Sequence, residues 1–291
     1  MRFSGGMNVR SLRTGLVAFL MVGAFSAKAD LPSLDDRKWV GCFLALENKH
    51  YQFSVNTQGK GKIEVLGAKG TPVSSKLWVS VEFIVQEILP DGKAVTKAIK
   101  PESLESAQTA TLKPQNIVIR GKVTGDAAFE AYMTEDRGAI SVGGKLVDAG
   151  GLTKNPLRFG VRVNFPNAYA NEKEKAADPK VDAKKAAKDF EQKIGKDRLQ
   201  LKWTDGKPLK QDLTASIDAT SKEVNGPGIA ALSLEYSSYQ GNKFILLASD
   251  NSSMTLSNAS AKPMNTGFVV YWAADPAKDP EGKARLTIDV K

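Results

Sequence analysis

The chain has 291 residues and a formal net charge of +9, but only one cysteine, Cys42, and one histidine, His50. A single cysteine can form no internal disulfide, and one residue of each kind cannot supply the three or four His or Cys ligands of a usual zinc site. The basic residues are spread along the chain without the clustering typical of nucleic-acid-binding proteins, so we expect no nucleic-acid partner.

Residues 1–29 are typical of a cleavable export signal. Arginines without any acidic residue precede an apolar run from Leu16 to Phe25, and Ala27 and Ala29 place small residues at −3 and −1 of a cleavage site before Asp30. The run holds only about ten residues, whereas a membrane-spanning helix needs about 20. We therefore expect a periplasmic or secreted protein, cleaved near Ala29 and without a transmembrane segment afterwards.

The expected export route also bears on cofactors and charge. The arginine pair of the twin-arginine signal is absent, which favours export as an unfolded chain and predicts that no cofactor is bound. Removal of residues 1–29 takes away four basic residues and no acidic one, so that the formal charge falls from +9 to +5. Such a diffuse charge is screened within about 8 Å at physiological salt.

Apolar and polar residues alternate through most of residues 37–165, as in Leu77–Val85 and Leu157–Phe165. A period of two indicates strands with one buried face, as in antiparallel sheets. Turn residues separate the expected strands at Pro90-Asp91-Gly92, Asp136-Arg137-Gly138, Gly143-Gly144 and Gly150-Gly151. This spacing of strands and turns predicts a β-sandwich or a barrel.

One segment breaks the alternation. Residues 171–193 are rich in Ala, Lys, Glu and Asp, and they predict a helix over 178–194 that is capped by Asp178 and ended by a left-handed Gly195. A narrow apolar stripe indicates that this helix packs on a sheet edge. Further strands are expected near residues 199–203, 213–217, 229–236, 243–248, 267–272 and 284–290.

We therefore predict a nearly all-β, mainly antiparallel protein with two β-sandwich-like units joined by one short α-helix. After the signal peptide at 1–29, the units are expected at 30–170 and 197–291, with a charged helical linker at 171–196. One large merged β-sandwich is the structural alternative.

Few residues suited to catalysis are present. His50 lies in a polar segment expected to be a loop, and the chain lacks the Gly-x-Ser-x-Gly turn that would present a serine nucleophile. Cys42 lies in an apolar run and is expected to be an inert core thiol. The carboxylates of Asp275–Gly282 lack the spacing of an EF-hand, so we expect a solvated loop there and no calcium site.

Two carboxylates would suffice for a glycoside hydrolase, which keeps that class open. Glu82 and Glu235 are the acids that lie on strongly apolar strands, although alternation places both on solvated faces. A carboxylate-based glycan hydrolase is therefore an alternative hypothesis.

The aromatic pair Tyr271-Trp272 suggests a binding surface. Neighbours on a strand point to opposite faces, so one of the two side chains is expected outside. We take Trp272 as the candidate for an exposed platform that stacks on a ligand. The remaining tryptophans have dense apolar neighbours and are expected in the core: Trp39, Trp78 and Trp203.

Basic residues suggest a second candidate surface. Arg158 and Arg162 share one strand face, and Arg120 and Lys122 share another. If those two strands paired, they would form a basic strip that could bind an anionic glycan. An ordinary solvated face is the alternative interpretation.

Three hypotheses about function follow. The first is an exported, non-catalytic binding or structural protein of the periplasm or cell envelope, with a glycan, an envelope polymer or a protein as its partner. The second is the glycan hydrolase. The third is an assembly subunit that pairs its edge strands with those of a partner.

Overall fold

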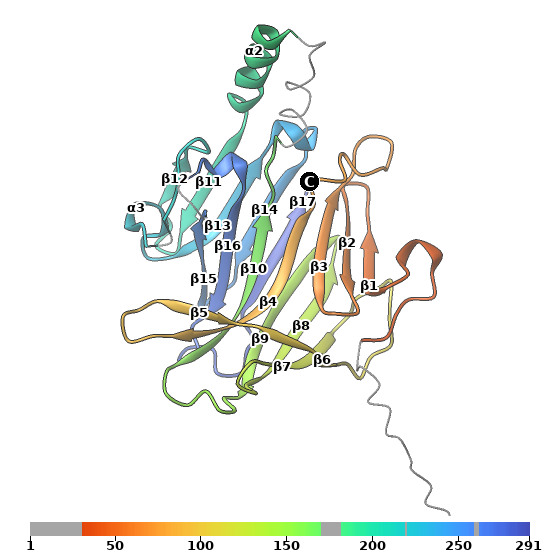
Figure 1. Cartoon of the computed structure of the whole chain (residues 1–291), viewed down its shortest axis with the longest axis vertical. Helices are drawn as coiled ribbons and strands as arrows, with labels where there is room; N and C mark the ends of the chain where they lie inside the picture. Colours follow the sequence, from red (N-terminus) through yellow and green to blue (C-terminus); the bar gives the residue numbers. More distant parts are fainter. Residues whose placement is uncertain (1–30, 170–181, 219, 259–261) are drawn as a thin grey trace, which may run out of the picture.

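The computed structural model describes residues 31–169, 182–218, 220–258 and 262–291 (Figure 1). The expected signal peptide lies outside the described residues, as do residues 170–181 of the expected linker. The described residues form one continuous curled sheet of seventeen strands, and every strand pair in it is antiparallel. The prediction of a mainly antiparallel all-β protein is confirmed.

The strands of the N-terminal stretch are β1 Cys42–Glu47, β2 Tyr51–Asn56, β3 Lys60–Val65, β4 Val79–Ile88, β5 Ala94–Lys97, β6 Ile99–Glu105, β7 Ile117–Val123, β8 Ala128–Asp136, β9 Ala139–Asp148 and β10 Leu157–Phe165. Those of the C-terminal stretch are β11 Arg198–Trp203, β12 Pro208–Gln211, β13 Ile229–Glu235, β14 Lys243–Ala248, β15 Ser252–Ser257, β16 Phe268–Ala274 and β17 Arg285–Val290. The helical elements are α2 Ala183–Ile194, α3 Lys222–Asn225 and the 3-10 turns η1 Arg37–Trp39, η2 Ser237–Tyr239 and η3 Met264–Thr266.

The two stretches share this sheet and do not form separate units. Strand β10 pairs with β16 from Gly160 opposite Ala273 to Phe165 opposite Phe268, and β9 pairs with β17. Strands β4 and β13 each pair with three others, so the sheet branches at both of them. Buried side chains from both stretches form one hydrophobic core. The expectation of two units with their own sheets is therefore corrected to one sheet around one core.

The alternation of buried and partly covered side chains in β10 agrees with the sequence pattern. In β10, Phe159, Val161 and Val163 are buried, whereas Arg158 and Arg162 are only partly covered. The residues expected as a strand near 213–217 form no strand. Leu213 and Ile217 are nevertheless buried, because backbone bonds tie this segment to residues 258–265.

Gly143 and Gly144 lie inside β9 and do not form the turn that we expected. A Cβ atom at Gly144 would lie 2.3 Å from the Glu130 carbonyl oxygen and 2.6 Å from the Phe159 ring. These glycines therefore allow neighbouring chain segments to approach closely. The turn expected at Asp136-Arg137-Gly138 is present, with positive φ at Arg137 and Gly138.

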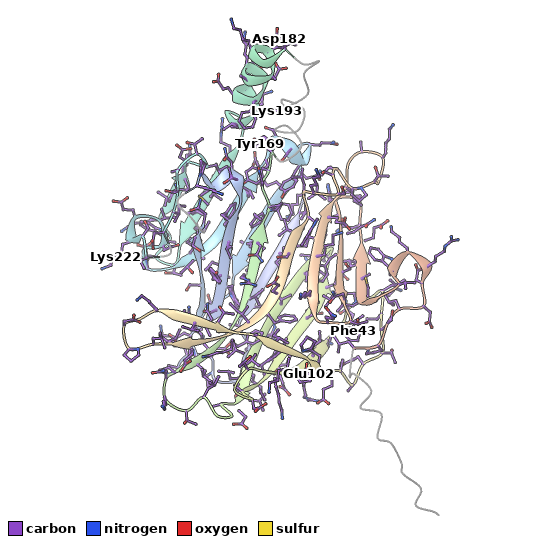
Figure 2. The ribbon with its side chains drawn as sticks, in the orientation of Figure 1. Phe43, Glu102, Tyr169, Asp182, Lys193 and Lys222 are labelled. Carbon is purple, nitrogen blue, oxygen red and sulfur yellow. The ribbon has the colours of Figure 1, made fainter. Side chains whose placement is uncertain are left out.

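Helix α2 projects beyond the sheet and does not lie along its edge (Figure 1). Asp182 caps the described helix, whereas the expected cap Asp178 lies outside the described residues. The C-cap Gly195 is right-handed with φ −61°, so the expected left-handed Gly195 is corrected. Tyr169 and Lys193 lie at the foot of the helix (Figure 2). Phe190 makes an edge-to-face contact with Tyr169, and the Ser237 hydroxyl donates to the Lys193 carbonyl. None of the described helices is long and apolar enough to span a membrane.

Candidate functional site

A polar surface covers the outer face of four neighbouring strands in the order β4, β10, β16 and β15. Each row across these strands is set by the register. One row holds Glu82, Arg162, Tyr271 and Thr255, and the next holds Ile84, Gly160, Ala273 and Ser253. The small members of the second row on β16 and β15, Ala273 and Ser253, lie at the floor of a depression.

This depression belongs to an open pocket of about 500 Å³. Loops after β11, β14 and β16 and the segment before β13 complete its walls. The residues that line it are Arg158, Thr204, Pro227, Asn251, Ser252, Ser253, Thr255, Tyr271, Ala273, Ala274, Asp275, Pro276 and Lys278. Hydroxyl and amide groups and one aromatic ring therefore surround the space, and three of the lining side chains are charged.

Arg158 is the most unusual of these side chains. Its Nε donates to the Gln86 amide oxygen at 2.9 Å, and Gln86 is itself buried. Among the described residues no carboxylate lies within ion-pair distance of Arg158, and its Nη groups donate no hydrogen bond. Burial lowers the pKa of the guanidinium, although an arginine stays charged at neutral pH.

Arg162, two residues along the same face, is neutralised by Glu82. Its Nε donates to Glu82 Oε2 at 3.1 Å, and an Nη group approaches the same oxygen. Burial alone would lower the pKa of Arg162, but the hydrogen bond and charge of Glu82 raise it overall. Tyr271 lies beside Arg162 and shares the outer face with it. Of the two expected arginines, only Arg158 keeps an uncompensated charge.

Trp272 does not form the exposed platform that we expected. Its side chain is 0% exposed and faces the core, opposite the buried Met254, and its indole N–H donates to the Ser252 hydroxyl at 3.0 Å. Tyr271 is the member of the pair on the outer face. The expectation fails because alternation shows only that the two side chains lie on opposite faces of the sheet. It does not show which of these faces the core covers.

The expected basic strip does not form. Strand β10 pairs with β4 and β16, whereas β7, which carries Arg120 and Lys122, pairs with β6 and β8. Arg120 is bound to Glu130 at 2.9 Å. Lys122 is exposed and lies opposite Lys100. Neither residue belongs to the pocket.

The acids that we considered for hydrolysis are also apart. Glu82 lies on β4 and binds Arg162, whereas Glu235 lies on β13 and binds Lys243 at 2.9 Å. In the Asp275–Gly282 loop, backbone N–H groups bind the carboxylates of Asp275 and Asp279. The described residues contain no group of three or more His, Cys, Asp or Glu side chains placed to hold a metal ion.

Several residues expected in the core are less buried than predicted. Cys42, Trp39 and Trp203 are half-buried, and Trp78 is 42% exposed beneath the Lys62 ammonium group. The cause at Trp39 and Cys42 is local, because residues 37–39 form the 3-10 turn η1 and the strand begins only at Cys42. His50 contacts Asn242 through its Nδ1 atom and lies outside this pocket.

Comparison with known proteins assigns no family. No protein-family model and no curated protein matches the chain. The α-N-acetylgalactosaminidase NagBb from Bifidobacterium bifidum, in complex with GalNAc, is similar with a TM-score of 0.46 and 11% identity over 85% of this chain and 36% of that chain. Its complex with Gal-NHAc-DNJ gives a TM-score of 0.43 and 13% identity over 85% and 35%. This chain thus spans about a third of that enzyme. A likeness at this level tells us nothing about activity.

Sequence reasoning found Arg158 but missed Ser253, Thr255 and the loop residues of the pocket. Strand β15 has the sequence Ser-Ser-Met-Thr-Leu-Ser, whose alternation is visible only over Met254 and Leu256. Tyr271 could have been considered from the sequence, because one member of the Tyr271-Trp272 pair has to face outward.

Proposed function

We propose that this chain is an exported, non-catalytic protein of the periplasm, cell envelope or medium that binds a glycan in the pocket formed by β10, β15 and β16. The pocket itself carries the proposal. It combines a shallow floor of small residues, a ring of hydroxyl and amide groups, and the half-buried ring of Tyr271. Sugars present hydroxyl groups at their edges and C–H groups on their faces, which suits such a mixed lining.

Export is supported by the composition of residues 1–29. The experiment that tests export is N-terminal sequencing of the protein recovered from the periplasm and medium of an expressing bacterium. We expect a mature chain that begins at Asp30. An uncleaved product in the cytoplasm would contradict the proposal of export.

The hydrolase alternative has less support in this pocket. Asp275 is the single carboxylate among the described lining residues, whereas glycoside hydrolysis ordinarily uses two acids about 5–10 Å apart. Both oxygens of Asp275 are also engaged, one with the Ala277 N–H and the other with Lys278 at 3.3 Å.

The alternative of an assembly subunit also has less support at one candidate edge strand, β1. Thr111 exchanges backbone hydrogen bonds with Phe43 and Ala45 of this strand, so that part of its edge is already paired.

A binding screen of the mature protein against a panel of neutral and acidic oligosaccharides and cell-wall fragments tests the glycan proposal. We expect saturable binding that weakens about threefold to tenfold in Tyr271→Ala, the loss expected for one aromatic contact. Trp78→Ala is the matched control, because Trp78 is exposed outside the pocket. Absence of binding to the whole panel, or a loss in Trp78→Ala instead, would contradict the proposal.

A further inference from the structure

The charge inside the pocket identifies a feature of its ligand beyond the presence of hydroxyl groups. The charged side chains that line the pocket are Arg158, Lys278 and Asp275. Lys278 lies 3.3 Å from Asp275, so these two offset one another. Arg158 thus supplies the pocket with a net single positive charge.

Among the described residues no nearby acid accounts for the Arg158 charge. Glu87, the next residue after its partner Gln86, is bound to Lys97 and to Asn155. Glu82 is bound to Arg162, and Asp275 is engaged as described above. A half-buried charge without a counterion is costly, and a bound anion would remove that cost.

The orientation of Arg158 is also fixed in advance. The bond from Nε to the buried Gln86 amide holds one edge of the planar guanidinium, and the two Nη groups remain for a ligand. Two parallel N–H donors match the two coplanar oxygens of a carboxylate. A dianionic phosphate monoester suits the pocket less well, because its second negative charge exceeds the single net positive charge of the lining.

We infer that the glycan bound here carries a carboxylate, as a uronic acid residue does, and that Arg158 binds this carboxylate while Tyr271 and the hydroxyl groups contact the sugar ring. This inference rests on the glycan-binding function proposed above. It assigns Arg158 as the residue that determines specificity for acidic over neutral glycans.

Matched ligand pairs test the inference by calorimetric titration of the mature protein. Oligogalacturonate and the corresponding galactose oligomer differ in the carboxylate, as do glucuronate- and glucose-based oligomers. We expect the acidic member of at least one pair to bind about tenfold or more tightly, the effect expected for hydrogen bonds to a charged group. Arg158→Gln should abolish this preference and retain weak binding of the neutral member, whereas Arg158→Lys should keep part of the preference.

Arg120→Gln serves as the control, because Arg120 is bound to Glu130 outside the pocket and should leave the preference unchanged. Thermal unfolding of each variant verifies that it folds. Equal binding of acidic and neutral members by the wild type, or an unchanged preference in folded Arg158→Gln, would overturn the inference and leave the proposed function standing. Failure of every glycan to bind would overturn both.

Discussion

Asp197 is a buried carboxylate that lies between the end of α2 and the start of β11. The Tyr169 hydroxyl donates to its Oδ2, and the Ser237 backbone N–H donates to its Oδ1 at 2.9 Å. Burial raises the pKa of Asp197, and the hydrogen bonds from Ser237 and Tyr169 and the charge of Arg198 only partly oppose this effect. The ionised form is therefore less favourable in the folded chain than in the unfolded one.

A raised pKa in the folded state makes the contribution of Asp197 to stability pH-dependent. This contribution is fully present below the usual pKa of the carboxyl group and is lost as the pH rises through the raised folded value. We therefore expect Asp197→Asn to be more stable than the wild type at pH 7, with a difference that shrinks toward pH 4. Urea unfolding at several pH values measures it. A difference in stability that does not change with pH would contradict the raised pKa of Asp197. Asp250→Asn is the control, because Asp250 lies on an exposed turn.

Tyr271, Trp272 and Arg158 show how far single residues could be placed from the sequence. Alternation correctly required one member of the aromatic pair to face outward, and it correctly put Arg158 and Arg162 on one face. It could not identify the partner strands. The partner across β10 decides that Arg162 meets Glu82 while Arg158 meets only the amide of Gln86. The functional difference between these two arginines therefore depends on a long-range register.

At the scale of elements, α2 is the part least supported by the sheet. Most of its described side chains are exposed, and a helix of twelve residues is marginal on its own in water. Its contacts with the body of the protein include the ring pair Phe190–Tyr169, the bond from Ser237 to Lys193 and the packing of Ile194 against the core. Composition predicted this helix, but its docking depends on Tyr169 and on η2, which are distant in the sequence.

Phe190→Ala should release α2 without unfolding the sheet. Removal of one edge-to-face ring pair costs about 0.5–1.5 kcal/mol beyond the area that it buries, which is comparable to what a short helix needs to stay folded. We expect a weaker helical circular-dichroism signal and faster proteolysis near Lys193, with the urea midpoint of the β signal nearly unchanged. Lys188→Ala, on the exposed side of α2, should change none of these. A lowered midpoint for the whole protein in Phe190→Ala would show that α2 is part of the core.

At the scale of the whole molecule, the strand pattern predicted the class and many of the strand positions, but it could not predict the connection between the two halves. β10 and β16 each read as a half-buried strand, and nothing in either sequence identifies the other as its partner. The pairing is nevertheless extensive, since it runs over six residue pairs and includes Tyr271 and Ala273 of the pocket lining. The pocket therefore takes Arg158 from the first stretch and its other lining residues from the second.

This shared architecture predicts that neither stretch folds alone. A fragment of residues 30–170 would expose the edges of β10 and β9, and a fragment of residues 197–291 would expose those of β16 and β17, together with the core faces that each covers in the other. We expect each fragment alone to aggregate or to lack a cooperative thermal transition. Co-expression should yield a β-rich complex, and chain 30–291 should unfold in one step. A monodisperse fragment with its own cooperative transition would restore the two-unit organisation, and the glycan pocket would then lie at a domain interface.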